Sequence, residues 1–207
     1  MGHIISNSPN EKWQLDIFYL ITYHKQNLGY KYILACIDIF TRKAYAIPLK
    51  LKDDENVSDA IKEILKQAQT TPYFITSDSD STFLSNESDK IFHKYDIIHK
   101  TVPVGDHASL GIIDRFARTL KTILHKRFVK YNSTNWVDSL SKIIEQYNYP
   151  SVDKLYKYLK TDGHKTTKKY IDEYLSKKMK SNNLKKLKKV RKKWDIFYLI
   201  HQMKNGS

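Results

Sequence analysis

Apolar runs along the first half of the chain predict five β-strands. The strongest is Tyr32–Phe40, which is apolar on both faces, as in a buried central strand. A short turn at 41–43 joins it to a strand at Ala44–Leu49, so we expect these two strands to be antiparallel neighbours. The other predicted strands are Trp13–Thr22, Tyr73–Thr76 and Ile97–Val102.

Apolar residues at helical spacing predict helices between and after these strands. The clearest is Leu110–Tyr131, which carries Asp114, Arg118 and Lys121 on the face opposite its apolar residues. The other predicted helices begin near Asp53-Asp54 or span Ser85–Tyr95 and Trp136–Tyr147. This order of elements predicts an α/β fold, a mixed five-stranded sheet flanked by helices, followed by a small basic helical segment.

Composition narrows the class of protein. Hydrophobic residues make up 41% of the 207, which is ample for a core and excludes a disordered chain. The single cysteine, Cys36, excludes a disulfide scaffold and a zinc site of several thiolates. No apolar run approaches the ~20 residues that span a bilayer, and Met1–Lys12 lacks the apolar stretch of a signal peptide. We therefore expect a soluble intracellular protein with no membrane partner.

Positive charge is concentrated at the C-terminal end. Residues 151–207 hold 17 Lys and Arg against 5 Asp and Glu, a net charge of +12 out of +14 for the chain. Such a block repels itself unless a polyanion or solvent neutralises it, which favours DNA or RNA as partner; the alternative is a solvated lysine tail. The candidate phosphate contacts in this tail are Lys185, Lys186, Lys188, Lys189 and Arg191.

The chain divides into three predicted regions: 1–149, 150–179 and 180–207. In the second, two short helices joined by Asp162-Gly163 fit either a helix-turn-helix-like DNA binder or a plain helical hairpin. In the third, residues 193–200 (KWDIFYLI) repeat most of residues 12–21 (KWQLDIFYLI), which indicates a partial duplication. Asp195 is then a second copy of Asp16, and the chain is expected to be a truncated or rearranged copy.

Three aspartates occupy positions that topology can bring together. Asp16 lies in the first predicted strand, Asp78 just past the strand Tyr73–Thr76, and Asp114 near the start of the long helix. The carboxyl ends of strands in α/β sheets are where ligands bind. Exactly 35 residues separate Asp78 from Asp114.

Four segments, in order, resemble the catalytic core of retroviral-type integrases. They are Trp13–Asp16, Tyr32–Leu49, Ile75–Phe83 and Gly111–Lys121. The resemblance runs from Trp13 to about Tyr147, and the chain looks most like the integrases of Maverick/Polinton elements and virophages. It implies a ribonuclease H-like fold. Residues 149–178 resemble, more weakly, a small helical module associated with the amino-terminal side of those integrases.

The resemblance implies that Asp16, Asp78 and Asp114 are the catalytic acidic triad and hold two Mg²⁺ or Mn²⁺ ions. The chemistry agrees, since carboxylate oxygens suit hard cations and two such ions suit displacement at phosphorus. Retroviral integrases place Glu at the third position, where this chain has the shorter Asp114. Asp38 and Asp80 are expected to be structural, as a strand-end residue and a turn-former; the alternative for each is a contact with metal.

The family pattern also assigns DNA contacts to residues near the triad. Arg118 and Lys121 share the polar helix face with Asp114; the alternative is a solvated face with an Asp–Arg pair. Arg115 adjoins them, and His107 is expected to contact substrate from the loop before the helix.

The resulting prediction is a DNA integrase or transposase that processes element ends and transfers strands, a polynucleotidyl transferase that works as a homo-oligomer. Its expected location is the host nucleus or a viral replication site. Two alternatives stay open: a catalytically decayed fragment that only binds DNA, and a ribonuclease H-like nuclease.

Overall fold

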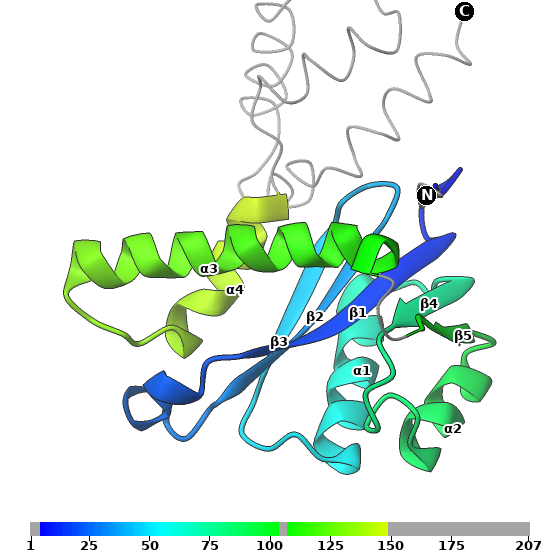
Figure 1. Cartoon of the computed structure of the whole chain (residues 1–207), viewed down its shortest axis with the longest axis horizontal. Coiled ribbons are helices and arrows are strands. Elements are labelled where there is room, and N and C mark those ends of the chain that lie inside the picture. Colours follow the sequence, from blue (N-terminus) through cyan, green and yellow to red (C-terminus); the bar gives the residue numbers. More distant parts are fainter. Residues whose placement is uncertain (1–4, 104–106, 149–207) are drawn as a thin grey trace, which may run out of the picture. The chain divides into compact units, whose positions relative to one another are not determined.

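Strand β1 (Lys12–Tyr19) is the central strand of a five-stranded sheet with the order β3-β2-β1-β4-β5. On one side β1 pairs with β2 (Tyr32–Asp38), which pairs with β3 (Ala44–Leu49), and both pairings are antiparallel. On the other side β4 (Phe74–Ser77) and β5 (Ile98–Thr101) run parallel to β1. The computed structural model, shown in Figure 1, describes residues 5–103 and 107–148.

Four α-helices accompany the sheet in the described residues: α1 (Asp54–Ala68), α2 (Asn86–Lys94), α3 (Gly111–Tyr131) and α4 (Val137–Asn148). Two short 3₁₀ helices, η1 (Ile21–Asn27) and η2 (His107–Leu110), lie in the connections. The predicted fold class, a mixed five-stranded sheet flanked by helices, is confirmed.

The two faces of β1 carry different chemistry. Successive side chains of a strand point to opposite faces. Trp13, Leu15 and Ile17 are buried in one apolar cluster with residues of α1 and α2. Gln14 lies on the other face and bonds to the start of α3. Figure 1 shows α3 crossing the sheet on the side away from α1.

Side-chain caps set the start of the two helices on the apolar-cluster face. The carboxylate of Asp53 accepts a hydrogen bond from Asn56 N–H at 2.8 Å, and Ser85 Oγ accepts one from Ser88 N–H at 3.2 Å. Both are residue types that satisfy the free N–H groups of a first turn. This local chemistry explains why α1 and α2 begin within one residue of their predicted positions.

The first strand is shorter than its sequence pattern predicts. Trp13–Thr22 was expected to be extended throughout, but pairing with β2 ends at Tyr19, opposite Tyr32, and η1 begins at Ile21. The chain then reverses through Leu28 and Gly29, which have φ of 53° and 84°. The β-branched and aromatic composition that predicted the strand continues beyond its last hydrogen-bonded partner.

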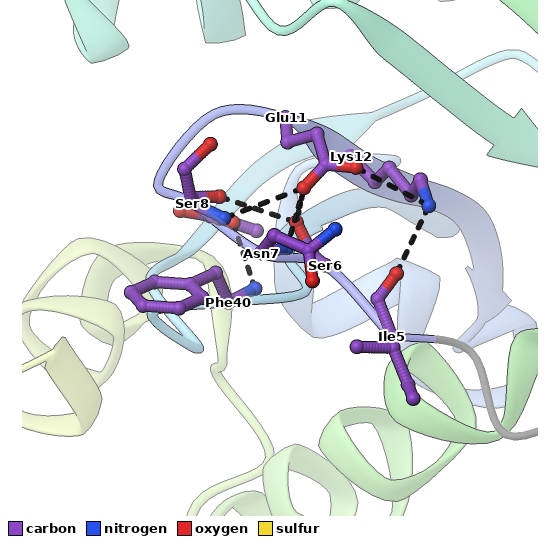
Figure 2. Close-up of polar contacts among 8 residues, drawn as sticks. Ile5, Ser6, Asn7, Ser8, Glu11, Lys12 and Phe40 are labelled. Carbon is purple, nitrogen blue, oxygen red and sulfur yellow. Dashed lines mark hydrogen bonds and ion pairs between the residues drawn. The ribbon is translucent and has the colours of Figure 1, made fainter.

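A polar turn anchors the entry to β1. Figure 2 shows the Glu11 carboxylate at its centre, where it accepts hydrogen bonds from the Ser6 hydroxyl and from the N–H groups of Asn7 and Ser8. Lys12 pairs with Glu11 at 3.3 Å and donates to the carbonyl of Ile5 at 2.9 Å. The Asn7 hydrogen bond lowers the pKa of Glu11, so the turn holds an ionised carboxylate at neutral pH.

The chain divides into two units, residues 1–144 and 145–207. The predicted helical module at 150–179 and the predicted basic tail at 180–207 lie outside the described residues, as does Asp195. Within the described part of the chain, every helix is too short or too polar to cross a bilayer.

Candidate active site

The parallel pairing of β1 and β4 brings Asp16, on β1, near Asp78, which directly follows β4. Gln14 pairs with Thr76. The same register continued by two residues sets Asp16 opposite Asp78, the residue directly after β4. Asp16 is partly buried and Asp78 is exposed. The carboxyl end of β4 therefore delivers Asp78 beside β1, as expected for a ligand-binding edge of an α/β sheet.

The third aspartate comes from α3. Asp114 is partly buried and lies in the first turn of the helix, one residue after Ile113, which is fully buried. A carboxylate in the first turn is favoured by the positive end of the helix dipole. Asp114 thus belongs to the element that crosses the polar face of β1.

Electrostatics link the three carboxylates. Burial raises the pKa of Asp16 to about 7, and the negative charges of Asp78 and Asp114 act in the same direction. The Ile17 N–H, which donates to Asp16 Oδ1 at 2.7 Å, and the ammonium of Lys121 act against them. Asp78 and Asp114, from two other elements, therefore both lie within electrostatic reach of Asp16.

The donor set has the chemistry of a divalent-cation site. Three carboxylates supply hard oxygen ligands, and burial with the nearby charges of Asp78 and Asp114 raises the pKa of Asp16, which a bound cation would lower again. Across residues 5–103 and 107–148, however, no three Asp, Glu, His or Cys side chains lie close enough together to hold an ion. Ligation by the triad therefore requires these side chains to converge further than they do here.

An ion pair and several hydrogen bonds hold the loop that carries Asp78. Lys52 forms an ion pair with Asp80 and also donates to the Tyr19 hydroxyl at 2.8 Å. Asp80 accepts two hydrogen bonds from Thr82, and its own N–H donates to Asp78 Oδ1 at 3.3 Å. Burial acts to raise the pKa of Asp80, but the bonds from Lys52 and Thr82 lower it overall. Asp80 is therefore a loop-forming residue, as its sequence position predicted.

Asp38 also has a structural place. It is buried at the end of β2, where its carboxylate accepts hydrogen bonds from the Thr41 hydroxyl at 2.6 Å and the Phe40 N–H at 3.0 Å. These bonds shape the tight turn between β2 and β3. No contact draws Asp38 toward the three aspartates in the part of the chain described.

The predicted DNA contacts fall into two groups. Arg115, Arg118 and Lys121 are exposed on α3, and the charge of Lys121 reaches Asp16. His107 begins η2, before α3. The five basic residues of the tail lie outside the described part of the chain: Lys185, Lys186, Lys188, Lys189 and Arg191.

Sequence reasoning missed two residues that support the site, Gln14 and Lys52. Their partners are distant in the chain: Gln14 bonds to Ile113, 99 positions away, and Lys52 bonds to Tyr19, 33 positions away. Gln14 could have been noticed as a polar residue inside an otherwise apolar strand. An exposed-looking lysine in a loop gives no comparable signal.

Comparisons with known proteins identify relatives of this chain in sequence and in fold. Residues 6–107 match the model of the integrase core domain. The chain is 29% identical over 126 residues to an uncharacterized transposon-derived protein of Caenorhabditis elegans, a match that covers 61% of this chain and 43% of that protein. It is 26% identical over 113 residues to the Gag-Pol polyprotein of Walleye dermal sarcoma virus, covering 55% of this chain and 6% of the polyprotein.

Solved structures share the fold. The trimeric form of the HTLV-2 integrase catalytic core domain in complex with magnesium superposes with a TM-score of 0.59 at 20% identity, covering 72% of this chain and 91% of that chain. A chain of the simian T-cell lymphotropic virus intasome, in complex with PP2A regulatory subunit B56 gamma, superposes with a TM-score of 0.61 at 21% identity, covering 69% and 50%.

The matched residues include β1 through β5 and two of the three aspartates, and the chain spans less than half of the length of these sequence relatives. Residues 6–107 are thus similar to an integrase core domain, the fold is the one found in solved integrase catalytic cores, and the sequence relatives include retroviral polyproteins and a transposon-derived protein.

Proposed function

We propose that this chain is a metal-dependent DNA integrase or transposase that processes the ends of a mobile or viral element and transfers them to target DNA. One observation supports this most strongly. Burial, together with the charges of Asp78 and Asp114, raises the pKa of Asp16 to about 7, so three carboxylates from separate parts of the chain influence one another. Strand transfer at phosphorus is a reaction that such a carboxylate cluster supports.

Asp16, Asp78 and Asp114 are the proposed ligands of Mg²⁺ or Mn²⁺. When bound, two such ions supply the Lewis acidity that activates an attacking oxygen and steadies the leaving one. The chain's own task is to bring the three carboxylates toward one another. Lys121 favours the ionised form of Asp16, and the Lys52–Asp80 pair holds the loop of Asp78.

Asp114 as the third carboxylate is part of the proposal. Its side chain is one methylene shorter than Glu, so its backbone has to lie nearer the ions. The N–H of its neighbour Ile113 is bonded directly to the side chain of Gln14 on β1. This direct bond supports a close approach of the first turn of α3 to the strand of Asp16.

DNA contacts are proposed for basic residues of α3, of the segment before it and of the tail. We assign Arg115, Arg118, Lys121 and His107 to DNA near the reacting phosphate, and the tail residues Lys185, Lys186, Lys188, Lys189 and Arg191 to other DNA phosphates. The HTLV-2 core was solved in dimeric and trimeric forms, and the simian viral protein in an intasome. A homo-oligomer on DNA is accordingly proposed for this chain.

The origin and location are finer proposals. The four matching segments resemble Maverick/Polinton and virophage integrases, while the relatives found are retroviral and transposon-derived. On either origin, the substrate is chromosomal or viral DNA, so the proposed location is the host nucleus or a viral replication site.

Strand transfer by the full chain tests the proposal. The chain is incubated with Mn²⁺ and a branched DNA that mimics a joined product, because resolving it depends little on terminal sequence. We expect resolution and joining by the wild type and none by Asp16→Asn. DNA binding without chemistry in both proteins supports the decayed fragment instead, and cleavage of an RNA–DNA hybrid without joining supports the nuclease.

A further inference from the structure

Gln14 is a fully buried polar residue whose side chain spans two elements. Its Nε2 donates to the Ser109 carbonyl at 2.7 Å, and its Oε1 accepts from the Ile113 N–H at 2.9 Å. Both polar atoms of the amide are therefore used. A buried amide that lost either partner would keep an unsatisfied group at a cost of about 1–3 kcal/mol, so the bonds hold the strand and the helix start together.

The bond to Ile113 replaces a local helix cap. The residue before α3 is Leu110, which has no side-chain oxygen, and no side-chain cap bond is made there. Ile113 is the third residue of the helix, and its N–H is the donor that a capping side chain normally satisfies. A residue 99 positions earlier in the chain therefore performs the capping.

Gln14 connects the elements that carry two of the three aspartates, Asp16 and Asp114. It lies two residues before Asp16 on the same strand, so both side chains point to the same face. Its acceptor bond ends on Ile113, the residue directly before Asp114. One side chain thus fixes the helix turn of the third carboxylate relative to the strand of the first.

We infer that Gln14 is a positioning residue for the metal site. Its bond to Ile113 fixes how far the backbone of Asp114 lies from the strand that carries Asp16. The inference rests on the proposed function. With the first turn of α3 fixed by Gln14, convergence of the triad is left to side-chain rotation and loop adjustment rather than to movement of the helix. Partners that orient metal ligands typically change metal affinity by 10–100-fold when removed.

Asn27 provides a matched control. It is also a buried amide, with Nδ2 donating to the Tyr23 and Thr134 carbonyls and Oδ1 accepting from the Trp136 and Val137 N–H groups. It fixes the start of α4 as Gln14 fixes the start of α3. Removing it removes buried hydrogen bonds without touching the helix turn of Asp114.

The test is a Mn²⁺ titration of the unfolding temperature of the full chain. Variants are Gln14→Met, similar in size but without the amide; Gln14→Asn, which keeps the amide but shortens its reach; and Asn27→Leu. We expect Mn²⁺ to raise the unfolding temperature of all four proteins. The Mn²⁺ midpoint shifts upward by roughly 10–100-fold in the Gln14 variants and stays at the wild-type value in Asn27→Leu. If Gln14→Met does not fold, Gln14→Asn decides.

Strand transfer supplies a second readout. High Mn²⁺ restores the activity of a Gln14 variant, because its ligands are intact, but not that of Asp114→Asn. A wild-type Mn²⁺ midpoint in the Gln14 variants, or an equal shift in Asn27→Leu, overturns the inference alone. Absence of any Mn²⁺ response in the wild type overturns the proposed metal site, and the positioning role with it.

Discussion

The two faces of β1 differ in what they do for the molecule. Trp13, Leu15 and Ile17 pack into the apolar cluster with α1 and α2, where the size and burial of each side chain determine its contribution to stability. Gln14 and Asp16 face α3, where one side chain caps a helix and the other carries a charge that burial disfavours. A single strand thus supplies both stability and the candidate site, separated only by the alternation of its side chains.

The largest expected effect is a loss of strand-transfer rate when one of the three proposed metal ligands is replaced. Asp78→Asn removes a proposed ligand that is exposed and follows β4, so the fold should survive. We expect strand transfer to fall by at least about 10³-fold, equivalent to about 4 kcal/mol of transition-state stabilisation. Single-turnover rates with Mn²⁺ measure this. Activity within tenfold of wild type would remove Asp78 from the site.

A substitution on the apolar-cluster face of β1 should lower stability and leave the strand-transfer rate nearly unchanged. Leu15→Ala leaves a cavity in the apolar cluster, where Leu15 is 1% exposed. We expect the free energy of unfolding to fall by about 2–5 kcal/mol, while strand transfer per folded molecule stays near the wild-type rate. Urea denaturation and an activity titration on the same sample measure both. Equal losses of rate in Leu15→Ala and Asp78→Asn would show that the two faces are not separable.

Asp16→Asn sharpens the comparison through pH. The pKa of Asp16 is about 7 in the folded chain, mainly because of burial, against about 3.9 unfolded. Its protonated form is therefore favoured by folding, and that stability is present below about pH 4 and lost as pH rises through 7. Asn mimics the neutral carboxyl.

The gain in unfolding free energy of Asp16→Asn over wild type should thus grow between pH 4 and 7 and then level off. After allowance for partial exposure, we expect it to reach on the order of 2 kcal/mol. Denaturation without metal at several pH values measures it. A pH-independent difference would contradict an uncompensated charge at Asp16.

The smallest expected effect is on stability, through the Lys52 contacts that hold the loop of Asp78. Lys52→Met removes the ion pair with Asp80 and the bond to Tyr19, at a cost of about 1 kcal/mol. Burial alone would raise the pKa of Asp80, but its bonds lower it, so this stability is present at neutral pH and lost as pH falls through that lowered pKa. In acid, wild type should therefore lose the part of its advantage over Lys52→Met that comes from the ion pair and keep only the part from the Tyr19 bond. An advantage that does not shrink as pH falls would exclude the ion pair as a source of stability.

Much of the fold could be predicted because it depends on patterns of neighbouring residues in the sequence. The period of apolar residues located five strands and four helices, and caps such as Asp53 and Ser85 marked two helix starts. The end of β1 could not be predicted, since Ile21 and Thr22 have strand-forming composition but no strand partner. Pairing, not propensity, decides where that strand stops.

The candidate site was only half visible in the sequence. Asp16, Asp78 and Asp114 could be picked out from a motif and its spacing, and Asp38 and Asp80 could be set aside as structural. Gln14 and Lys52 were missed because their function depends on partners that only the folded chain brings near. The residues that support a site leave a weaker trace than the residues that carry its chemistry.

Electron paramagnetic resonance of Mn²⁺ bound to the full chain tests the central claim most directly. If the three aspartates form one site, wild type should bind two Mn²⁺ ions that are magnetically coupled through their proximity, and Asp16→Asn, Asp78→Asn and Asp114→Asn should each abolish the coupled signal. A wild type that binds no Mn²⁺, or a coupled signal that persists in any of the three variants, would contradict it.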